Sequence, residues 1–434
     1  MSSDKVLDRE GNLEVRPFMK KIIIIGGGAA GMMAAGRAAE CGAKVTLLEK
    51  TNSLGNKLLI TGKDRCNFTN TALLKEFISK FGKKGNFLYP AFYNFFNEDL
   101  IEFFKKLNVP SKEERGGRIF PQSDKSEDIQ NALVHFVKKS GVEICLRKSV
   151  KEIVTEGKGI CAVKIKDDEV IECNSVILCT GGMSYPSTGS TGDGYKIAQK
   201  LGHTIVQLRP ALVPLNTVEK WVRKLQGLTL KNVNVIAKDS NGKKICEEFG
   251  DMLFTHFGVS GPIILSMSKK IGENLERGKV FLHIDLKPAL SFEKLDLRIQ
   301  NDFKKYSNKI FSNAIDDLLP KSLIPVIVQL SSIPKDKVVH SITKQERLNL
   351  VKLLKNLRLE VFRTYPITAA IITNGGISLK EVDHHTMESK FIKGLYFAGE
   401  ILDIDATTGG YNLQMAFSTG RLAGESASKC NSSE

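Results

Sequence analysis

Three glycines and one acid near the N-terminus have the spacing of a dinucleotide-binding site. The loop Gly26 to Gly31 (GGGAAG) follows the apolar run Ile22 to Ile25 and precedes an alanine-rich segment that is predicted to be helical. Such glycines permit a tight turn, close approach of a pyrophosphate and close packing of the helix, whose N-terminus attracts negative charge. Glu49 ends the next apolar segment 18 residues after Gly31, which is the reach expected for a carboxylate that accepts ribose hydroxyl hydrogen bonds. The predicted dinucleotide contacts are Gly26, Gly28, Ala29, Ala30, Gly31 and Glu49.

A second polar segment near the C-terminus indicates which dinucleotide is bound. The strand-like Gly394 to Ala398 ends in Gly399-Glu400, and an Asp- and Gly-rich loop and a helix follow. The chain has one glycine fingerprint and no second one for a separate NAD(P)H domain, so the C-terminal clamp favours FAD in an extended form. A helix N-terminus at Gly410 to Gln414, aimed at the N1/C2=O side of the flavin, would stabilise its reduced anion. The alternative is that Gly409 and Gly410 only form the turn into the last helix.

The elements that must position these residues form an α/β fold. Residues 20–50 alternate strand, glycine turn, helix and strand, which predicts a βαβ unit and a parallel, doubly wound sheet. A helix over Glu127 to Ser140 and a buried strand over Ser175 to Cys179 continue the pattern. Because parallel strands end at the same sheet edge, Thr180-Gly181 and Gly399-Glu400 are expected to meet there.

The middle of the chain has a different character. Residues 204–290 contain short alternating strands and the turn signal Asn241-Gly242, which predict an antiparallel β unit. Residues 291–358 have apolar side chains at helical spacing. The predicted partition is an N-terminal extension over 1–18 that is disordered, a discontinuous FAD domain over 19–195 and 365–434, and an insert with a β part over 196–290 and 359–364 and a helical part over 291–358. Met19 is an alternative start of the chain.

Composition limits the remaining choices. No apolar run reaches the roughly 20 residues of a membrane span, and the first 18 residues lack the apolar middle of a secretory signal. Eight scattered cysteines without a CxxC pair favour a reducing cytoplasm and no metal site, and His384-His385 is read as a surface turn. The net charge of +15 could attract nucleic acid, but the lysines occur as dispersed pairs, which favours solvated faces. The oligomeric state stays open.

Five segments carry a resemblance to a known family. These are Ile60 to Asn70, Gly116 to Ser126, Leu178 to Tyr195, Gly250 to Pro262 and Gly394 to Phe417. They resemble the BaiN-type (YhiN-like) NAD(P)/FAD-dependent oxidoreductases, also called the aminoacetone oxidase family, from about residue 20 to the C-terminal helix. The resemblance implies a glutathione-reductase-type FAD domain whose insert is an antiparallel β-barrel and a small helical bundle.

The resemblance also assigns individual contacts with FAD. Arg65, Cys66 and Asn67 would approach the flavin end and Val150 would offer backbone groups to the adenine. The other implied contacts are Lys50, Thr180, Gly181, Asp193, Gly399, Glu400, Gly409, Gly410, Tyr411 and Asn412. This sequence departs from the family pattern at Asp64, where glycine is usual, and at Asn56, where a basic residue is frequent. An aspartate tolerates a left-handed backbone, but its carboxylate would alter the flavin environment.

Three side chains are candidates for catalysis. Cys66 could be a thiol that reacts beside the flavin, or a packing residue. His256 could be a general acid, or a satisfied structural histidine. Tyr411, with Tyr185 as an alternative, could donate a proton or pack on the flavin ring.

The sequence therefore predicts an FAD-dependent oxidoreductase that transfers hydride through flavin N5 to a small organic substrate. The preferred hypothesis is an NAD(P)H-dependent reductase of an activated double bond, with NAD(P)H as a transient donor. The alternatives are an amine oxidase-like flavoenzyme, a flavoprotein that acts on or binds RNA, and a flavin-dependent sensor without turnover.

Overall fold

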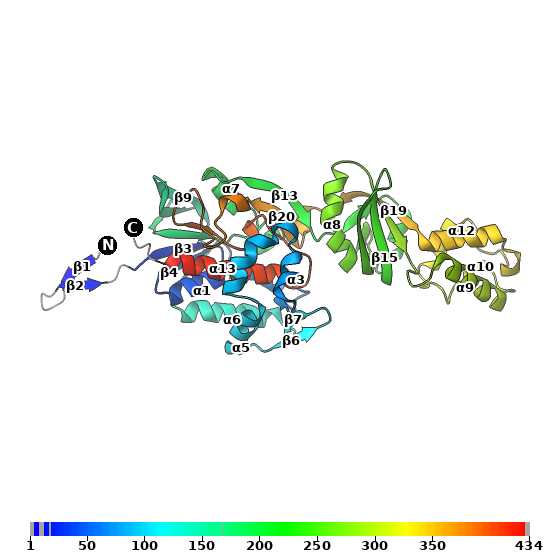
Figure 1. The fold of residues 1–434 in the computed structure, drawn as a ribbon, viewed down its shortest axis with the longest axis horizontal. Helices are drawn as coiled ribbons and strands as arrows, with labels where there is room; N and C mark the ends of the chain where they lie inside the picture. Colours follow the sequence, from blue (N-terminus) through cyan, green and yellow to red (C-terminus); the bar gives the residue numbers. More distant parts are fainter. Residues whose placement is uncertain (1–3, 8–12, 17–18, 167, 430–434) are drawn as a thin grey trace. The chain divides into compact units, whose positions relative to one another are not determined.

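The computed structural model describes residues 4–7, 13–16, 19–166 and 168–429, and the chain divides into two compact units (Figure 1). The first unit is Met1–Leu208 with Ile372–Glu434, and the second unit, Arg209–Ile371, is an insertion between these two stretches. The predicted boundary at residue 195 is too early, because α7 (Asp193–Lys200) buries Tyr195, Ile197 and Ala198 in the core of the first unit. The chain likewise returns to the first unit at Ile372 rather than at 365.

The N-terminal extension is described only in part. Asp4–Leu7 (β1) and Leu13–Arg16 (β2) pair as antiparallel strands. The rest of the stretch that was predicted to be disordered, residues 1–3, 8–12 and 17–18, lies outside the described residues.

A five-stranded parallel sheet forms the centre of the first unit. Its order is β21-β12-β3-β4-β8, and the strands are Leu395–Phe397, Ser175–Leu178, Lys21–Ile25, Lys44–Glu49 and Glu143–Leu146. Ile22 to Ile25 are all buried, as expected for a central parallel strand with both faces covered. The predicted α/β fold is confirmed by this order, in which the first half of the chain and the C-terminal stretch pair through β12 and β21.

Two helices from opposite ends of the chain pack together beside the sheet (Figure 1). They are α1 (Ala29–Glu40) and α13 (Tyr411–Ser428). A Cβ on Gly420 would lie 2.3 Å from the Ala30 carbonyl oxygen, and a Cβ on Gly424 would lie 2.5 Å from that of Ala34. Glycine therefore permits backbone contact between the helices, and this contact fixes the C-terminal helix on the glycine loop helix.

Residues 56–121 form elements that periodicity did not predict. They comprise α2 (Asn56–Leu59), α3 (Leu74–Ser79), α4 (Tyr89–Asn94), α5 (Asn97–Lys106) and the sheet β5-β7-β6 (Thr69–Asn70, Arg118–Pro121, Ser111–Glu114). Phenylalanine rings pack between them, for example Phe77 on Phe92 at 5.3 Å and Phe68 on Phe104 at 5.0 Å between ring centroids. α6 (Ser126–Lys139) follows close to the predicted helix. A further small sheet has the order β11-β10-β9 (Val170–Glu172, Gly159–Ile165, Val150–Glu156).

The second unit is a closed β-barrel with a helical part. The barrel order is β14-β17-β16-β15-β18-β19, with strands Leu215–Thr217, Gly258–Ser260, Lys244–Phe254, Thr229–Asp239, Val280–Asp285 and Leu357–Thr364. Its helices are α8 (Pro262–Leu275), α9 (Phe292–Lys305), α10 (Phe311–Ala314), α11 (Ile324–Ser331) and α12 (Lys344–Lys355). The β-barrel and helical insert implied by the resemblance is thus confirmed.

Candidate functional site

Three strand ends meet at one edge of the central sheet, here called the carboxyl edge. β3 leads into Gly26, β12 into Thr180-Gly181, and β21 into Gly399-Glu400. The parallel registers Leu178↔Ile25 and Leu178↔Phe397 bring these three turns side by side. The expectation that two distant segments end at the same edge is confirmed.

The glycine loop is shaped by close contacts on one side and open space on the other. A Cβ on Gly31 would lie 1.8 Å from the Gly26 carbonyl oxygen, and a Cβ on Gly26 would lie 2.6 Å from that of Cys179. At Gly28 nothing lies within 4 Å of such an atom. Gly26 and Gly31 are therefore required by the fold itself, whereas the absence of a side chain at Gly28 leaves open the space before the α1 N-terminus.

Glu49 binds the glycine loop through its carboxylate. The Gly27 amide donates to Oε2 at 2.7 Å, and the backbone and hydroxyl of Thr51 both donate to Oε1 at 2.8 Å. Glu49 is 9% exposed, so most of its charge is held away from water. The structure places this acid where the second strand meets the loop, as the motif predicts.

The next residue, Lys50, connects the sheet to α7. Its Nζ lies 2.6 Å from Asp193 Oδ2 and also donates to the Thr191 hydroxyl. Burial alone would raise the pKa of the Asp193 carboxyl, but the hydrogen bonds from Lys50 and Thr191 hold it below its usual value. Lys148 donates its amide to the Glu49 carbonyl at 3.0 Å, so the segment that leads to Val150 lies beside Glu49.

A network around Glu400 joins the turn after β21 to the loop after β12 and to two neighbouring elements. Lys57 Nζ lies 2.7 Å from Glu400 Oε2 and 2.6 Å from the Ser184 hydroxyl, and Ser184 donates to Glu400 Oε1 at 3.1 Å. The Thr373 amide donates to the same Oε1 at 2.8 Å. Glu400 is thus fixed by α2, by the loop after β12 and by β20 (Ile372–Ile377).

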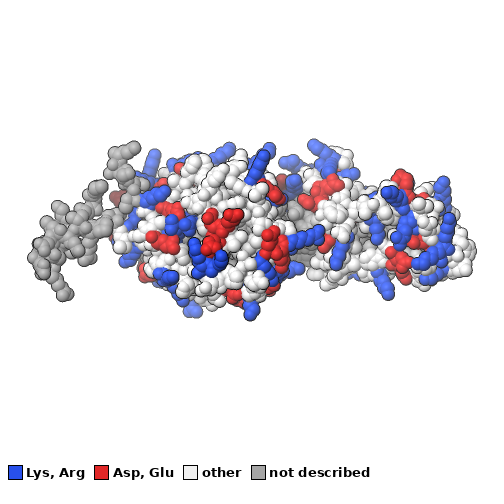
Figure 2. All heavy atoms as spheres, turned by 60° about the horizontal axis from the view of Figure 1, so that its bottom comes forward, with Lys and Arg blue, Asp and Glu red and all other residues white. Residues whose placement is uncertain are grey.

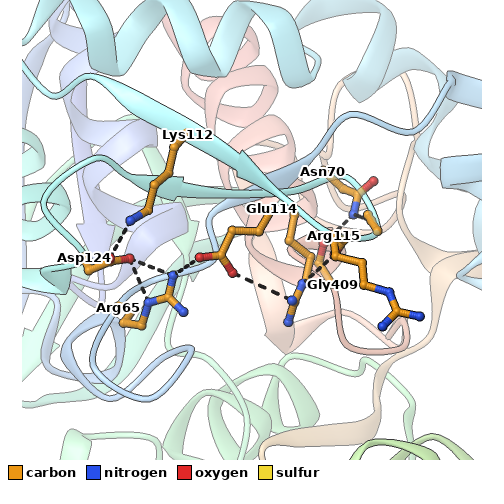
Figure 3. Close-up of polar contacts among 9 residues, drawn as sticks. Arg65, Asn70, Lys112, Glu114, Arg115, Asp124 and Gly409 are labelled. Atoms are coloured by element: carbon orange, nitrogen blue, oxygen red, sulfur yellow. Dashed lines mark hydrogen bonds and ion pairs between the residues drawn. The ribbon is translucent and has the colours of Figure 1, made fainter. Parts of the chain in front are cut away.

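The segment over residues 67–70 lies against the turn into α13. Asn70 Nδ2 donates to the Gly409 carbonyl at 3.0 Å (Figure 3), and Thr69 Oγ1 donates to Gln414 Oε1 at 2.6 Å. A Cβ on Gly410 would lie 2.2 Å from the Thr69 carbonyl oxygen. Asn412 holds the preceding loop, because its amide accepts from the Ala406 N–H at 2.8 Å and donates to the Ala406 carbonyl at 2.9 Å. The structure therefore brings Thr69 and Asn70 against the TTGGYN motif, which lies far away in sequence.

Arg65 lies beside these residues in a cluster of paired charges (Figure 3). Its guanidinium contacts Glu114 and lies 2.8 Å from Asp124 Oδ1, and Lys112 pairs with the same Asp124 carboxylate. The hydrogen bond from Lys112, followed by that from Arg65, lowers the pKa of Asp124. Asp64 adopts a left-handed backbone with φ of 64°, is exposed, and its carbonyl accepts the Ser126 amide at 2.9 Å. The departure from glycine at this position is therefore accommodated in the backbone.

The carboxyl edge fits an elongated dinucleotide. The open space at Gly28 faces the free N–H groups of the α1 N-terminus, which suit a pyrophosphate. Among the described residues, the buried atoms Thr180 Oγ1 and Asn67 Oδ1 have no hydrogen-bond partner, and buried polar atoms are normally paired. A ligand that lies along this edge would give them partners. The residues that would hold FAD are those of the glycine loop, Glu49, Asn67, Thr180 and the turns at Gly399 and Gly410.

Two of the predicted catalytic residues are buried in the first unit. Cys66 is fully buried, and burial raises the pKa of its thiol to about 12. It therefore stays protonated near neutral pH, which supports the packing interpretation. Tyr411 is 6% exposed and its ring packs on Phe77 at 4.7 Å. Burial, and then the charge of Glu76, raise the pKa of its hydroxyl.

His256 belongs to the second unit. It is exposed in the turn between β16 and β17, with its ring 4.8 Å from that of Phe257. Its role as a general acid stays a prediction. Tyr185, in the first unit, has a left-handed backbone with φ of 51° beside Ser184, and strained backbone of this kind concentrates at functional sites.

Several residues of the carboxyl edge were missed by sequence reasoning. Lys57, Ser184 and Thr373 surround Glu400, and Asn374 Nδ2 donates to Asp405 Oδ1 at 2.6 Å in a buried contact. None belongs to a motif with a known spacing. The one signal available was their position within or next to the long polar, glycine-rich segments of the chain.

No helix in the described part of the chain is both long and apolar enough to cross a membrane. The same residues contain no group of three or more His, Cys, Asp or Glu side chains that could hold a metal ion.

Comparisons with known proteins agree with this architecture. The family model described as HI0933-like protein Rossmann domain matches residues 20–426. The 3-dehydro-bile acid delta(4,6)-reductase of Clostridium scindens is 31% identical over 95% of this chain and 100% of that protein. The ribosomal RNA dihydrouridine synthase of Escherichia coli is 31% identical over 92% of this chain and 95% of that protein.

Solved structures of flavoenzymes share the fold. A 3-ketosteroid-delta4-(5alpha)-dehydrogenase from Rhodococcus jostii aligns with a TM-score of 0.52 over 96% of this chain and 98% of that one, at 16% identity. A flavocytochrome c3 fumarate reductase aligns with a TM-score of 0.51 over 94% of this chain and 78% of that one, also at 16% identity. Because the family model matches residues 20–426, this chain belongs to the HI0933-like (BaiN/YhiN-type) family of FAD-dependent oxidoreductases.

Proposed function

We propose that this protein reduces a carbon–carbon double bond conjugated to a carbonyl group, with NAD(P)H as the electron donor. The observation that carries the proposal is the pair of relatives that match nearly the whole chain. One is named a delta(4,6)-reductase of a 3-dehydro-bile acid and the other a dihydrouridine synthase. A bile acid and a nucleoside have little in common, but both names describe saturation of a double bond next to a carbonyl. The common chemistry is therefore a better guide than either substrate.

The carboxyl edge supports this chemistry through the positions of its own side chains. When FAD is bound, it supplies hydride transfer through its N5 atom. The chain orients the dinucleotide with Glu49 and the glycine loop, and the α13 N-terminus after Gly410 favours negative charge in front of it. The overall reaction takes a hydride from NAD(P)H to the β-carbon of the substrate and a proton to its α-carbon.

That proton requires a donor, and three hydroxyl or imidazole groups are candidates. Tyr411 and Tyr185 are in the first unit and His256 is in the second. The Cys66 thiol is a poor candidate, because it is fully buried and burial raises its pKa to about 12. We expect Tyr411→Phe, Tyr185→Phe or His256→Asn to slow substrate reduction about 10²- to 10⁴-fold if the altered residue is the acid, while flavin reduction by NAD(P)H stays unchanged.

The test separates the two half-reactions under anaerobic conditions. The holoenzyme is mixed with NADH, NADPH or a panel of amines, and the flavin absorbance is followed by stopped flow. Bleaching by NADH or NADPH, followed by reoxidation with an enone such as cyclohexenone, supports the proposal. Bleaching by amines alone would favour the amine oxidase alternative and overturn it, and inertness to all donors would favour a sensor without turnover.

A second candidate function is reduction of uridine within RNA. The observation that favours it is the charge of the second unit, which has 27 Lys and Arg against 16 Asp and Glu. Such an excess suits a polyanionic substrate. The test is to incubate the holoenzyme and NADPH with unmodified ribosomal RNA transcripts and to measure dihydrouridine by nucleoside mass spectrometry. Absence of dihydrouridine, with enone reduction intact, would exclude this candidate and leave the first.

A further inference from the structure

The positive charge of the chain is concentrated in the second unit. This unit has a net charge of +11 in 163 residues, whereas the first unit has +4 in 271 residues. The first unit has 36 Lys and Arg against 32 Asp and Glu, so most of its positive charge is balanced, whereas the second unit has 27 against 16. Figure 2 shows Lys and Arg side chains spread along the visible face of this unit, with fewer acidic ones between them.

A basic groove lies at one end of the β-barrel. It has a volume of about 450 Å³ and lies between the β15–β16 hairpin turn and the C-terminal end of α8. Lys243 and Lys244 come from the hairpin, and Lys270, Arg277 and Lys279 come from α8 and the segment after it. Two carboxylates, those of Asp239 and Glu273, also line the groove. Five cations against two anions give it a net positive charge.

The hairpin holds its lysines in a defined turn. Asp239 Oδ1 accepts the backbone amides of Asn241 and Lys243, both at 2.9 Å, and Gly242 takes a φ of 80°. The strand pairing Asp239↔Val280 places the turn beside the start of β18. One of the two acidic residues of the groove therefore fixes the turn that carries Lys243 and Lys244.

Three of the cations have no carboxylate partner in the described part of the chain. Lys244 pairs with Glu247, and Lys279 Nζ lies 2.8 Å from Glu360 Oε1. Lys243, Lys270 and Arg277 are exposed, and no ion pair to any of them is found among the described residues.

We propose that this groove binds the phosphate backbone of RNA and so docks an RNA substrate; this inference rests on the second candidate function. The polar side chains of Ser240, Asn241 and Asn274 also line the groove and can bond ribose 2′-hydroxyls. None of the large apolar side chains that are exposed on the described residues lines it. Surfaces that bind membranes commonly combine basic residues with such apolar anchors, so the polar lining favours a nucleic acid.

The test measures binding of the holoenzyme to a fluorescein-labelled single-stranded RNA by anisotropy between about 50 and 200 mM salt. The groove variant is Lys243→Ala/Lys270→Ala/Arg277→Ala. The matched control, Lys304→Ala/Lys321→Ala/Lys335→Ala, removes the same charge from the helical part of the same unit, at exposed lysines for which the described residues show no ion pair. Loss of three phosphate contacts should make the negative slope of log affinity against log salt shallower by about 2. The control should leave the slope nearly unchanged.

The outcomes separate the groove from the proposed function. Equal losses of RNA affinity in both variants would show that RNA binds through charge spread over the whole unit. That result would overturn the proposal. Groove-dependent binding to phosphatidylserine vesicles without binding to RNA would assign the groove to a membrane surface and would also overturn the proposal. Groove-dependent RNA binding without dihydrouridine formation would support RNA binding at the groove and reject RNA reduction as the function. Enone reduction by the groove variant, at the rate of the unaltered enzyme, verifies that the variant is folded.

Discussion

The two units differ in how they use charge. In the first unit the acids and bases at the carboxyl edge are paired at short range, as in Lys57 with Glu400 and Lys50 with Asp193. In the second unit a large excess of cations includes Lys243, Lys270 and Arg277, for which the described residues provide no partner. Paired charges fix geometry, whereas unpaired exposed charges attract a ligand from a distance. This difference underlies our proposals that the first unit holds the cofactor and that the second contributes to substrate recognition.

The largest effect is expected in the first unit, at the glycine loop. Gly31→Ala puts a Cβ 1.8 Å from the Gly26 carbonyl oxygen, so the loop must deform. The free energy of unfolding should fall by about 1–3 kcal/mol or more. The purified variant should lack FAD and melt at a lower temperature than the wild-type apoprotein. The ratio of flavin to protein absorbance and a thermal melt measure both effects.

Gly28→Ala is the matched control for this variant. Its Cβ meets nothing within 4 Å, so the apoprotein should melt as the wild type does while FAD binding falls. If Gly28→Ala bound FAD as tightly as the wild type does, the open space at Gly28 would have no functional meaning.

The next effect tests whether paired charges position the site. Glu400→Gln removes the partner of Lys57, whose side chain is 26% exposed, but keeps an acceptor for the Thr373 amide. Leaving the ammonium without its partner should cost about 1–3 kcal/mol of folding free energy. It should also weaken FAD binding, as measured by flavin fluorescence titration. The control, Glu425→Gln, removes a partner of Arg37 on α1, and an equal loss of FAD affinity there would contradict the special role of Glu400.

A pH effect is expected from a buried histidine of the first unit. His203 is 2% exposed, with Nε2 3.0 Å from the Ser389 hydroxyl and Nδ1 3.3 Å from Glu381 Oε2. Burial lowers the pKa of its imidazole, although Glu381 opposes this. Because the unfolded chain then binds the proton more readily, stability should be complete above the unfolded value of about 6.5 and fall as the pH drops below it. Melting temperatures between about pH 5 and 8 should show this slope, and His203→Gln should flatten it; a slope unchanged by the substitution would contradict the assignment.

The smallest effect is expected at Cys66. Since burial raises the pKa of its thiol to about 12, Cys66 should resist alkylation in the native protein while the exposed Cys41 reacts. Cys66→Ala should cost about 1–2 kcal/mol of stability and leave flavin reduction within a few-fold of the wild type. Mass spectrometry of labelled peptides and stopped flow measure these quantities. A loss of several hundred-fold would restore Cys66 as a catalytic residue.

Much of the first unit could be predicted because its elements obey local rules. The strands of the βαβ unit over residues 20–50 and the strand over Ser175 to Cys179 are largely apolar runs. Glycine is required at 26 and 31 because a Cβ there would clash with nearby backbone. Residues 56–121 could not be predicted in this way. Their helices are short and are held by packing of phenylalanine rings, such as Phe77 on Phe92, rather than by a periodic apolar face. Likewise, the boundary at residue 195 failed because α7 is assigned to the first unit by what it packs against.

By itself, the sequence determined the dinucleotide fingerprint, the α/β class and the presence of a separate insert, because glycine spacing and apolar periodicity are local properties of the chain. Only the tertiary structure decided that Glu400 is held by Lys57, Ser184 and Thr373, and that Asn70 meets Gly409. It also decided that most of the net positive charge belongs to the second unit, where basic residues from two distant segments line a groove. These relations join residues far apart along the chain, and such pairs come together only when the whole chain has folded.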